Sequence, residues 1–301
     1  MKKVAILAAD YMLAGQAGKQ GDSVERDEQM GKIIPAFKAQ GMNAELVRWR
    51  SAAKLASEFD AMLPLFVWDY FEGNETNFLK EMAKAEQKTE LFNSFSVLQW
   101  NSEKTYLDRL AKEGAPVIET IILERVTQTG VSKAFKTLQT DKLVIKPLIG
   151  GGAWRQVLYT KGDSFPSKKE LPPEGAMVQA FLPSVTKEGE YSFLYFGGQF
   201  SHGLIKRPKA GDYRIQSIYG GTEEKYSPNA AEKDTARRVL DTLNFTPLYA
   251  RVDLLRGLDG RLKLIELEMI EPYLYLLCAD GDGADNKGAQ KLAAALKSLL
   301  K

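Results

Sequence analysis

The dipeptide Asp259-Gly260 lies between two long, mainly apolar segments, residues 248–258 and 261–270. Asp-Gly is a strong signal for a two-residue hairpin turn, because both residues tolerate the positive φ angles that such a turn needs. The sequence therefore predicts an antiparallel hairpin in which Leu258 faces Arg261. Every further pair along the two strands then has the same sum of residue numbers.

Three carboxylates come together in this register. Asp253 is predicted to lie opposite Glu266, and Arg251 opposite Glu268. Glu266 and Glu268 are two residues apart on one strand, so both point to the same face. The other face is predicted to enter a core and carries Ile265, Leu267 and Met269.

The predicted carboxylate cluster needs a positive partner, since like charges that face each other across a strand pair are destabilising. Oxygen ligands favour a hard divalent cation, Mg²⁺ above all and Mn²⁺ as a second choice, and one or two such ions would also carry nucleotide phosphates. The alternative is a solvated acidic strand face that Arg251 and Lys263 neutralise. The residues alone favour neither interpretation, because a slip of one residue would separate Asp253 from Glu266.

The first ninety residues show the rhythm of an α/β domain. Residues 4–8 form a continuous apolar run, which indicates a strand that is buried on both faces of a parallel sheet. Residues 15–22 are rich in Gly and Gln and are predicted to be a loop, and residues 24–40 a helix. Residues 44–49 and 59–67 are predicted to be strands. This alternation predicts a doubly wound parallel sheet.

The remainder of the chain contains more strands than helices. A capping signature and an apolar face predict a helix over residues 102–113. Residues 143–145 are a predicted strand, and Gly197-Gly198 is the predicted turn of a second hairpin over residues 191–205. Residues 289–300 form an amphipathic helical pattern. The C-terminal part is therefore predicted to be of the α+β class.

A lysine and three glycines follow one of these strands. Lys146 lies at the end of the strand, and Gly150, Gly151 and Gly152 can present backbone N–H groups to phosphate oxygens. The alternative is a mobile hairpin tip, which triple glycines mark more often. The segment matches neither a P-loop nor a dinucleotide-binding fingerprint. Lys104, at the start of a predicted helix, would normally be interpreted as a solvated side chain.

Composition excludes several classes of protein. The net charge of +2 over 301 residues does not favour binding to nucleic acid or to a membrane surface. The single cysteine, Cys278, cannot form an internal disulfide, which fits the cytoplasm. The only histidine, His202, lies within a predicted strand, so a structural role is favoured over zinc binding or a Ser/His/Asp triad.

Taken in order, these segments resemble the ATP-grasp superfamily over residues 95–301. The resemblance is carried by residues 101–104, 144–152, 177–182, 189–193, 206–208, 212–214, 250–253 and 265–272. The most similar members are the glutathione-synthetase-like and ribosomal-S6-modification-like ones, and residues 68–70 and 100–101 look like the cycloserine-biosynthesis subgroup. The resemblance implies an N-terminal α/β domain (1–94), a small ATP-grasp lobe (95–175) and a large lobe with the metal site (176–301).

The resemblance also implies a role for each candidate residue. The ATP phosphates would be held by Lys104, Lys146 and the loop of Gly150, Gly151 and Gly152. The hinge that reads adenine with backbone groups would be Gln179, Ala180, Phe181 and Leu182, with Glu190 close to the ribose. The magnesium ligands would be Asp253, Glu266 and Glu268. The residues that bind the substrate carboxylate or stabilise its acyl phosphate would be Arg251, Lys206 and Arg214.

The implied reaction is an ADP-forming ligation of a small carboxylate to an amine or similar nucleophile through an acyl phosphate, either between two molecules or within one. A kinase that stops at phosphorylation and a nucleotide-binding regulatory protein are the alternatives. The implied partners are small, amino-acid-like substrates, and a homodimer is compatible with the family. The chain departs from the subgroup before Trp68, where it has Leu65, Phe66 and Val67 instead of an arginine, and over residues 15–22.

Overall fold

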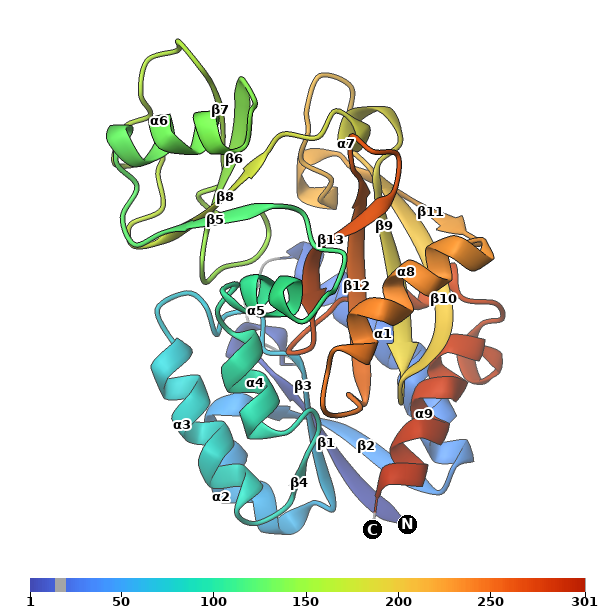
Figure 1. Ribbon diagram of the computed structural model, residues 1–301. Helices are drawn as coiled ribbons and strands as arrows, with labels where there is room; N and C mark the ends of the chain where they lie inside the picture. Colours follow the sequence, from blue (N-terminus) through green and yellow to red (C-terminus); the bar gives the residue numbers. More distant parts are fainter. Residues whose placement is uncertain (14–19, 301) are drawn as a thin grey trace.

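The computed structural model describes residues 1–13 and 20–300, in which the strands form three separate sheets (Figure 1). The first sheet lies at the end of the molecule where the two termini meet. The second, smaller sheet stands apart from the first, beside helix α6 (Gln128–Thr137). The third and largest sheet runs alongside both.

The N-terminal sheet is parallel and has the strand order β2-β1-β3-β4. Its elements are β1 (Lys2–Ala8), α1 (Gln20–Ala39), β2 (Met42–Arg48), α2 (Ala52–Leu55), β3 (Ala61–Phe66), α3 (Glu75–Glu86), β4 (Glu90–Leu91) and α4 (Phe95–Asn101). Residues 4–9 are fully buried, as the continuous apolar run predicts. Val4 and Ile6 pack with Ile33 of α1, whereas Ala5 and Leu7 pack with Phe78 of α3. Helices therefore cover both faces, and the predicted doubly wound sheet is confirmed.

The second sheet is antiparallel, with the order β5-β8-β6-β7. It consists of β5 (Thr120–Leu123), β6 (Lys142–Pro147), β7 (Val157–Thr160) and β8 (Ala176–Ala180), and α6 covers one face. Helix α5 (Tyr106–Lys112) precedes it. The strand predicted over residues 143–145 is β6, and Lys146 is near its end.

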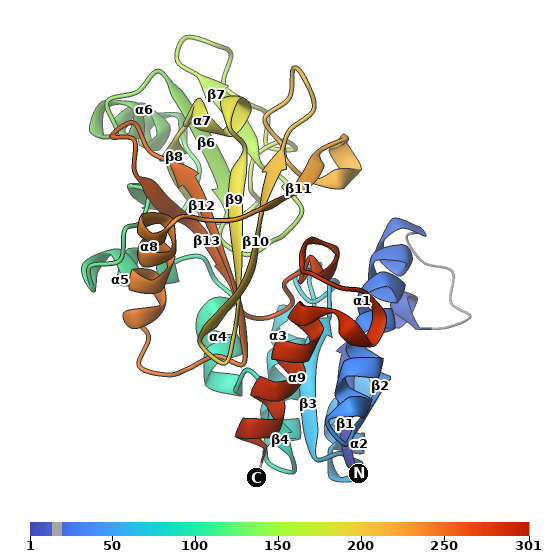
Figure 2. The same cartoon turned by 90° about the vertical axis from the view of Figure 1, so that its right-hand side faces the viewer.

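The third sheet is also antiparallel and has the order β11-β10-β9-β12-β13. Its elements are α7 (Ser184–Lys187), β9 (Glu190–Phe196), β10 (Gln199–Arg207), β11 (Thr222–Tyr226), α8 (Ala230–Asp241), β12 (Tyr249–Arg256), β13 (Leu262–Glu268) and α9 (Lys287–Leu299). The predicted hairpin around Gly197-Gly198 is present as β9–β10. Helix α9 (Lys287–Leu299) lies beside α1 and packs against β9 and β10 of the third sheet (Figure 2).

The turn of the β12–β13 hairpin is not the predicted one. Arg256 pairs with Leu262, so residues 257–261 make a five-residue connection instead of a two-residue turn. The backbone N–H of Gly257 donates to the carbonyl of Arg261 at 2.8 Å and holds this longer loop together. The strand pairing next to the turn is therefore shifted by one residue.

A β-bulge at Ile265 shifts the pairing back, because one extra residue of β13 stands unpaired there. Beyond the bulge Asp253 pairs with Glu266 and Arg251 with Glu268, as predicted. The bulge also turns Ile265 away from Leu267 in the core and toward the other face of the sheet. The prediction that Ile265 enters the core beside Leu267 is therefore wrong.

Two helix starts also differ from prediction. The predicted helix over residues 102–113 is shorter, because Ser102 follows the end of α4 and its hydroxyl donates back to Gln99 at 3.0 Å. The backbone N–H of Lys104 donates to Leu148 at 2.9 Å, so this segment joins the second sheet before α5 begins. In the N-terminal part, residues 15–19 of the predicted loop lie outside the described residues, and residues 20–22 are the first turn of α1.

Two buried asparagines tie the hairpin to the N-terminal part. Asn93 donates to the carbonyls of Tyr249 and Met269 at 3.0 and 2.8 Å and accepts from the Leu248 N–H at 2.7 Å. Asn101 bonds the backbone of residues 267 and 269 in the same way, at 2.8 and 2.9 Å. These bonds hold the strand that carries Glu266 and Glu268 against the end of α4.

Replacing Asn93 with alanine is expected to lower the free energy of unfolding by about 3 kcal/mol or more, because three buried backbone groups lose their partner. Denaturant unfolding of the variant measures this change. Asn244→Ala removes an exposed amide of the same size and should change the unfolding free energy by less than about 0.5 kcal/mol. Equal stabilities of the two variants would contradict the role of Asn93.

No helix in the part of the chain that the structure describes is both long enough and apolar enough to cross a bilayer.

Candidate active site

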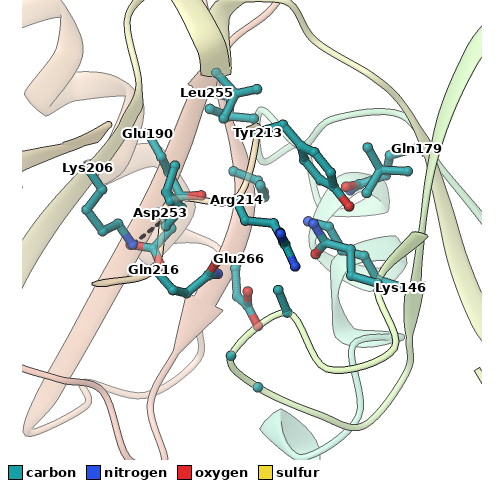
Figure 3. A pocket seen from close by; sticks show the side chains of 18 of the residues that line it. Lys146, Gln179, Glu190, Lys206, Tyr213, Arg214, Gln216, Asp253, Leu255 and Glu266 are labelled. Atoms are coloured by element: carbon teal, nitrogen blue, oxygen red, sulfur yellow. Dashed lines mark ion pairs between the residues drawn. The ribbon is translucent and has the colours of Figure 1, made fainter. Parts of the chain in front are cut away.

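One cavity between the second and third sheets brings the predicted site residues together. Figure 3 shows Lys146 and Gln179, from the second sheet, on one side, and Glu190, Lys206 and Asp253, from the third, on the other. All of the residues predicted for the site line this cavity, namely Lys104, Lys146, Gly150, Gly151, Gly152, Gln179, Ala180, Phe181, Leu182, Glu190, Lys206, Arg214, Arg251, Asp253, Glu266 and Glu268.

Arg251 pairs with both of the carboxylates nearest to it on β12 and β13. Its guanidinium forms a two-point contact with Asp253 on the same strand, with Nε to Oδ1 at 3.0 Å and Nη2 to Oδ2 at 2.9 Å. It also bonds Glu268 across the strand pair and the carbonyl of Tyr273. Because Arg251 and Asp253 are both buried, this pairing takes two charges out of water together.

A second buried cation supports Asp253 from the neighbouring strands. Lys206 lies 2.6 Å from Glu190 and 3.5 Å from Asp253, and the Ser192 hydroxyl donates to Asp253 as well. Burial opposes ionisation of Asp253, but Arg251 and Lys206 outweigh it and lower its pKa to about 2. Asp253 is therefore held as a charged carboxylate.

The glycine loop is held down by Lys104. The Lys104 ammonium donates to the carbonyl of Gly150 at 2.6 Å and pairs with Glu266 at 3.0 Å. Gly151 passes so close to the ring of Phe71 that a Cβ there would lie 3.1 Å from it, and Gly152 has a φ of +59°. Both positions favour glycine, and the loop closes over the carboxylates of β13.

Lys146 is a buried cation with no direct partner among the described residues. It is 8% exposed, and its ammonium forms neither an ion pair nor a hydrogen bond with any residue in the described part of the chain. Burial lowers its pKa. An unpaired ammonium in this position is costly, and an anion placed between Lys146 and the glycine loop would offset that cost.

The three predicted magnesium ligands each form an ion pair with a lysine or arginine side chain. Among residues 1–13 and 20–300, no three His, Cys, Asp or Glu side chains are placed to share a metal ion. The side chains of Glu266 and Glu268 are 26% and 29% exposed toward the cavity, whereas that of Asp253 is 2% exposed. Burial, with repulsion from Glu266, raises the pKa of Glu268 to about 7. Two accessible carboxylates fit Mg²⁺, which commonly takes one or two from the protein and the rest of its oxygens from phosphates and water.

The far end of the cavity is apolar. Ile118, Leu182, Leu255 and Ile265 belong to one buried cluster that lines it. The backbone N–H of Phe181 donates to the carbonyl of Lys142 at 2.9 Å, so it is used within the protein. The backbone groups on either side of Phe181 border this apolar end, which suits a flat heterocycle.

Sequence reasoning missed several cavity residues. Leu255 lies two positions after Asp253 on the same strand, and this spacing could have identified it. Ile265 lines the cavity only because the bulge turns it to that face. Ile118 lines the cavity only because the backbone of residues 116–118 pairs with Leu264 at the edge of β13. Tyr275 lies with its ring 5.5 Å from the Arg251 guanidinium and 5.7 Å from the Lys206 ammonium. No local sequence pattern identifies Ile265, Ile118 or Tyr275 as a cavity residue.

The three predicted catalytic cations differ in their accessibility. Arg251 and Lys206 are buried in the ion pairs described above. The side chain of Arg214 is 36% exposed, bonds Asp212 of its own loop, and lies 3.8 Å from the centre of the Tyr219 ring. Arg214 is therefore the cation of this group that an incoming ligand reaches most easily.

His202 lies outside the cavity and is structural, as the sequence favours. A carbonyl can only accept, so Nε2 donates to Leu274 at 2.9 Å, and Nδ1 accepts from the Ser201 hydroxyl at 2.9 Å. Burial lowers the pKa of His202 to about 4. The ring is therefore neutral in the folded protein.

The unfolding free energy is expected to fall as the pH drops from about 6.5 toward 4, because the unfolded chain binds a proton at His202 before the folded one does. The contribution is fully present above pH 6.5, and its loss approaches about 1.4 kcal/mol per pH unit. Unfolding curves of the wild type and His202→Gln at several pH values isolate it, since other groups titrate in both. Identical pH profiles would exclude a neutral, buried His202.

Known proteins resemble this chain in sequence. The family model of the N-terminal domain of D-cycloserine synthetase DcsG matches residues 4–93. The cycloserine biosynthesis protein DcsG of Streptomyces lavendulae is 27% identical over 290 residues, which cover 91% of this chain and 96% of that protein. A glutathione synthetase of Prochlorococcus marinus (strain MIT 9313) is 29% identical over 149 residues, 46% of each chain.

Solved structures share the whole fold. The crystal structure of D-cycloserine synthetase DcsG superposes with a TM-score of 0.84 at 22% identity and covers 99% of this chain and 100% of that one. A D-alanine–D-alanine ligase from Bacillus anthracis, solved with ATP, gives a TM-score of 0.65 at 14% identity over 99% of both chains. The N-terminal parallel sheet and the two antiparallel sheets therefore make up an ATP-grasp fold, and the chain is similar in sequence and in structure to D-cycloserine synthetase DcsG.

Proposed function

We propose that this protein is an ADP-forming ligase, which uses ATP and Mg²⁺ to phosphorylate the carboxylate of a small, amino-acid-like substrate and then joins the acyl group to an amine or similar nucleophile. The observation that carries the proposal is the buried, unpaired ammonium of Lys146 beside the glycine loop. A triphosphate supplies the counter-charge that this lysine lacks. Phosphoryl transfer depends mainly on positioning and charge neutralisation, which the cavity is equipped to provide.

The proposed nucleotide site follows the cavity from its apolar end to its charged end. Adenine lies among Ile118, Leu255 and Ile265 and bonds the Ala180 carbonyl and the Leu182 N–H. Glu190 is placed toward the ribose. The phosphates lie under Gly150, Gly151 and Gly152, between the ammonium groups of Lys104 and Lys146.

Magnesium would be held by Glu266 and Glu268, with Asp253 behind them, and by the phosphates themselves. When bound, it neutralises charge on the phosphates. Without nucleotide, the Lys104 ammonium pairs with Glu266. With nucleotide and magnesium bound, it would pair with the phosphates instead. Arg251 keeps Asp253 and Glu268 in place, and this role does not require it to leave its ion pairs.

The proposed chemistry has two balanced steps. A carboxylate oxygen of the substrate attacks the γ-phosphorus, the bond to the bridging oxygen of ADP breaks, and an acyl phosphate forms. The nucleophile then attacks the acyl carbon, inorganic phosphate leaves, and the proton of the nucleophile passes to solvent. Arg214 is the accessible cation for the substrate carboxylate, and Lys206 and Arg251 stabilise the charge of the acyl phosphate.

The substrate class is proposed from an acceptor in the cavity. Gln216 lines the cavity, and its Oε1 is buried and makes no hydrogen bond within the described residues. This oxygen suits the ammonium group of an amino acid. The similarity to a cycloserine biosynthesis protein supports an amino-acid-like substrate. The proposed ligation joins either two molecules or two groups of one molecule.

The test is Mg²⁺-dependent release of ADP with pools of amino acids and their derivatives, followed by mass spectrometry of the products. A condensed or cyclised product that appears with stoichiometric ADP and phosphate is expected. ADP release with a stable phosphorylated product would identify a kinase instead. ATP-induced thermal stabilisation without ADP release in any pool would reject turnover and favour a nucleotide-binding regulator.

A further inference from the structure

A second cavity lies behind the third sheet, away from the nucleotide site. It has a volume of about 820 Å³ and is bordered by the last turn of α1, the first half of β10, the end of β11 and the exposed side of α9. Figure 2 shows α9 beside α1 and β10, which are three of the elements that border this cavity. It shares no lining residue with the nucleotide cavity. Its size is within the range of metabolite-binding pockets, about 300–1,000 Å³.

Lysines surround this cavity. Of the described residues that line it, four are lysines and one is an aspartate, which gives the lining a net charge of +3 with His202 neutral. The whole chain carries only +2, so this cavity collects more positive charge than the average of the surface. The concentration of charge in a concave site attracts anions, because the field of several ammonium groups adds up there.

Three of the lysines have no carboxylate partner among the described residues. Lys291 donates to the carbonyls of Phe200 and Ser201 at 3.1 and 3.3 Å, and Lys287 to the side-chain oxygen of Gln290 at 3.2 Å. Lys233 lies 5.0 Å above the Phe200 ring. All of these contacts are to neutral groups, so no carboxylate of the described residues compensates these three positive charges. The fourth, Lys225, is paired with Asp280.

We propose that this lysine cavity is a binding site for a small anionic metabolite that carries more than one phosphate group. Its charged end is formed by Lys233, Lys287 and Lys291, and the ring of Phe200 and neighbouring alanines of α1 and α9 supply an apolar wall for the body of the ligand. The cations that line the cavity are all lysines, which bind phosphate as compact point charges, and the lining contains no arginine, whose planar fork matches carboxylates.

The position of the cavity connects it to the active site. The segment that follows β13 places Tyr275 against Arg251 and Lys206 in the nucleotide cavity, and three residues later places Cys278 in the lysine cavity. His202 borders the lysine cavity and holds Leu274 of the same segment. A ligand in the lysine cavity therefore contacts the segment that positions Tyr275.

The test is a calorimetric titration with inorganic pyrophosphate in magnesium-free buffer. Three proteins are compared, namely the wild type, the cavity variant Lys233→Gln/Lys287→Gln/Lys291→Gln, and a control variant Lys133→Gln/Lys136→Gln/Lys168→Gln. The control removes the same charge from exposed lysines elsewhere. Any binding of pyrophosphate in the nucleotide cavity is retained in all three proteins and does not disturb the comparison.

We expect a binding component in the wild type and the control that is at least 10-fold weaker in the cavity variant. An unchanged isotherm in the cavity variant, an equal loss in the control, or no component beyond that of the nucleotide cavity would overturn the proposal. A parallel titration with citrate tests the ligand class, and citrate bound as tightly as pyrophosphate would reject the assignment to phosphates. None of these outcomes depends on the ligase reaction, so the two proposals fail separately.

Discussion

Replacing Glu266 with glutamine is expected to lower Mg²⁺- and ATP-dependent ADP release by about 100-fold or more while the protein stays folded. The side chain faces the cavity, and its carboxylate is 3.0 Å from the Lys104 ammonium. An amide of the same shape removes the negative charge that a divalent cation needs. Lys104 retains its bond to the Gly150 carbonyl, so the loss of its ion pair should disturb the fold little.

The measurement has two parts, steady-state ADP release and the shift in melting temperature on addition of Mg²⁺ and ATP. The variant should melt near the wild-type temperature without ligand and lose most of the shift that depends on Mg²⁺. Glu45→Gln, which neutralises an exposed carboxylate of β2, is the matched control and should behave as wild type. Unaltered turnover in Glu266→Gln would show that Glu266 does not bind the metal ion.

Replacing Arg251 with methionine is expected to lower the free energy of unfolding by about 3–5 kcal/mol, because two carboxylates lose the cation that neutralises them. Asp253 is almost fully buried, and the same guanidinium also bonds Glu268. Methionine keeps much of the apolar volume, so the change isolates the charge. Lysine should restore only part of the stability, since one ammonium cannot reproduce the two-point contact of the guanidinium.

Arg207→Met is the matched control for this prediction. Arg207 pairs with Glu224 on the neighbouring strand, but the two side chains are 42% and 70% exposed. Loss of such a surface pair should cost less than about 1 kcal/mol. Chemical denaturation compares the two variants directly. A wild-type stability of Arg251→Met would show that Asp253 and Glu268 find other partners, and the ion-pair network would then not be central to the fold.

The hairpin of β12 and β13 shows which structural features local sequence patterns can predict. The alternation of residues 250–256 and 262–268 predicted which side chains share a face, apart from Ile265. The assumed turn at Asp259-Gly260 predicted the pairs Asp253–Glu266 and Arg251–Glu268, which are present although the turn is longer. The turn and the bulge at Ile265 each displace the pairing by one residue, in opposite directions. A bulge depends on what the strand packs against, and Ile265 packs against Ile118 and Leu255, which lie far away in the sequence.

The proposed phosphate-binding residues, Lys104 and the triple glycine, carry no strong signal of their own in the sequence. Lys104 was interpreted by itself as a solvated lysine, and the triple glycine by itself as a mobile tip. Only the ordered resemblance to ATP-grasp proteins assigned them to one site. Their proximity depends on the backbone bond from Lys104 to Leu148 and on the bond from the Lys104 ammonium to Gly150, which join segments more than forty residues apart.

By itself, the sequence determined the fold class and most of the strand faces, because periodicity acts over a few residues and can be deduced from neighbours in the chain. The resemblance to ATP-grasp proteins predicted the charged and glycine residues of the nucleotide cavity, but not Ile118, Ile265 or Tyr275. Only the tertiary structure decided which charges are compensated. It pairs Asp253 with Arg251 and Lys206, leaves Lys146 without a partner, and gathers Lys233, Lys287 and Lys291 around a second cavity. The reason is physical, because burial and charge pairing depend on side chains from distant segments that meet only in the folded protein.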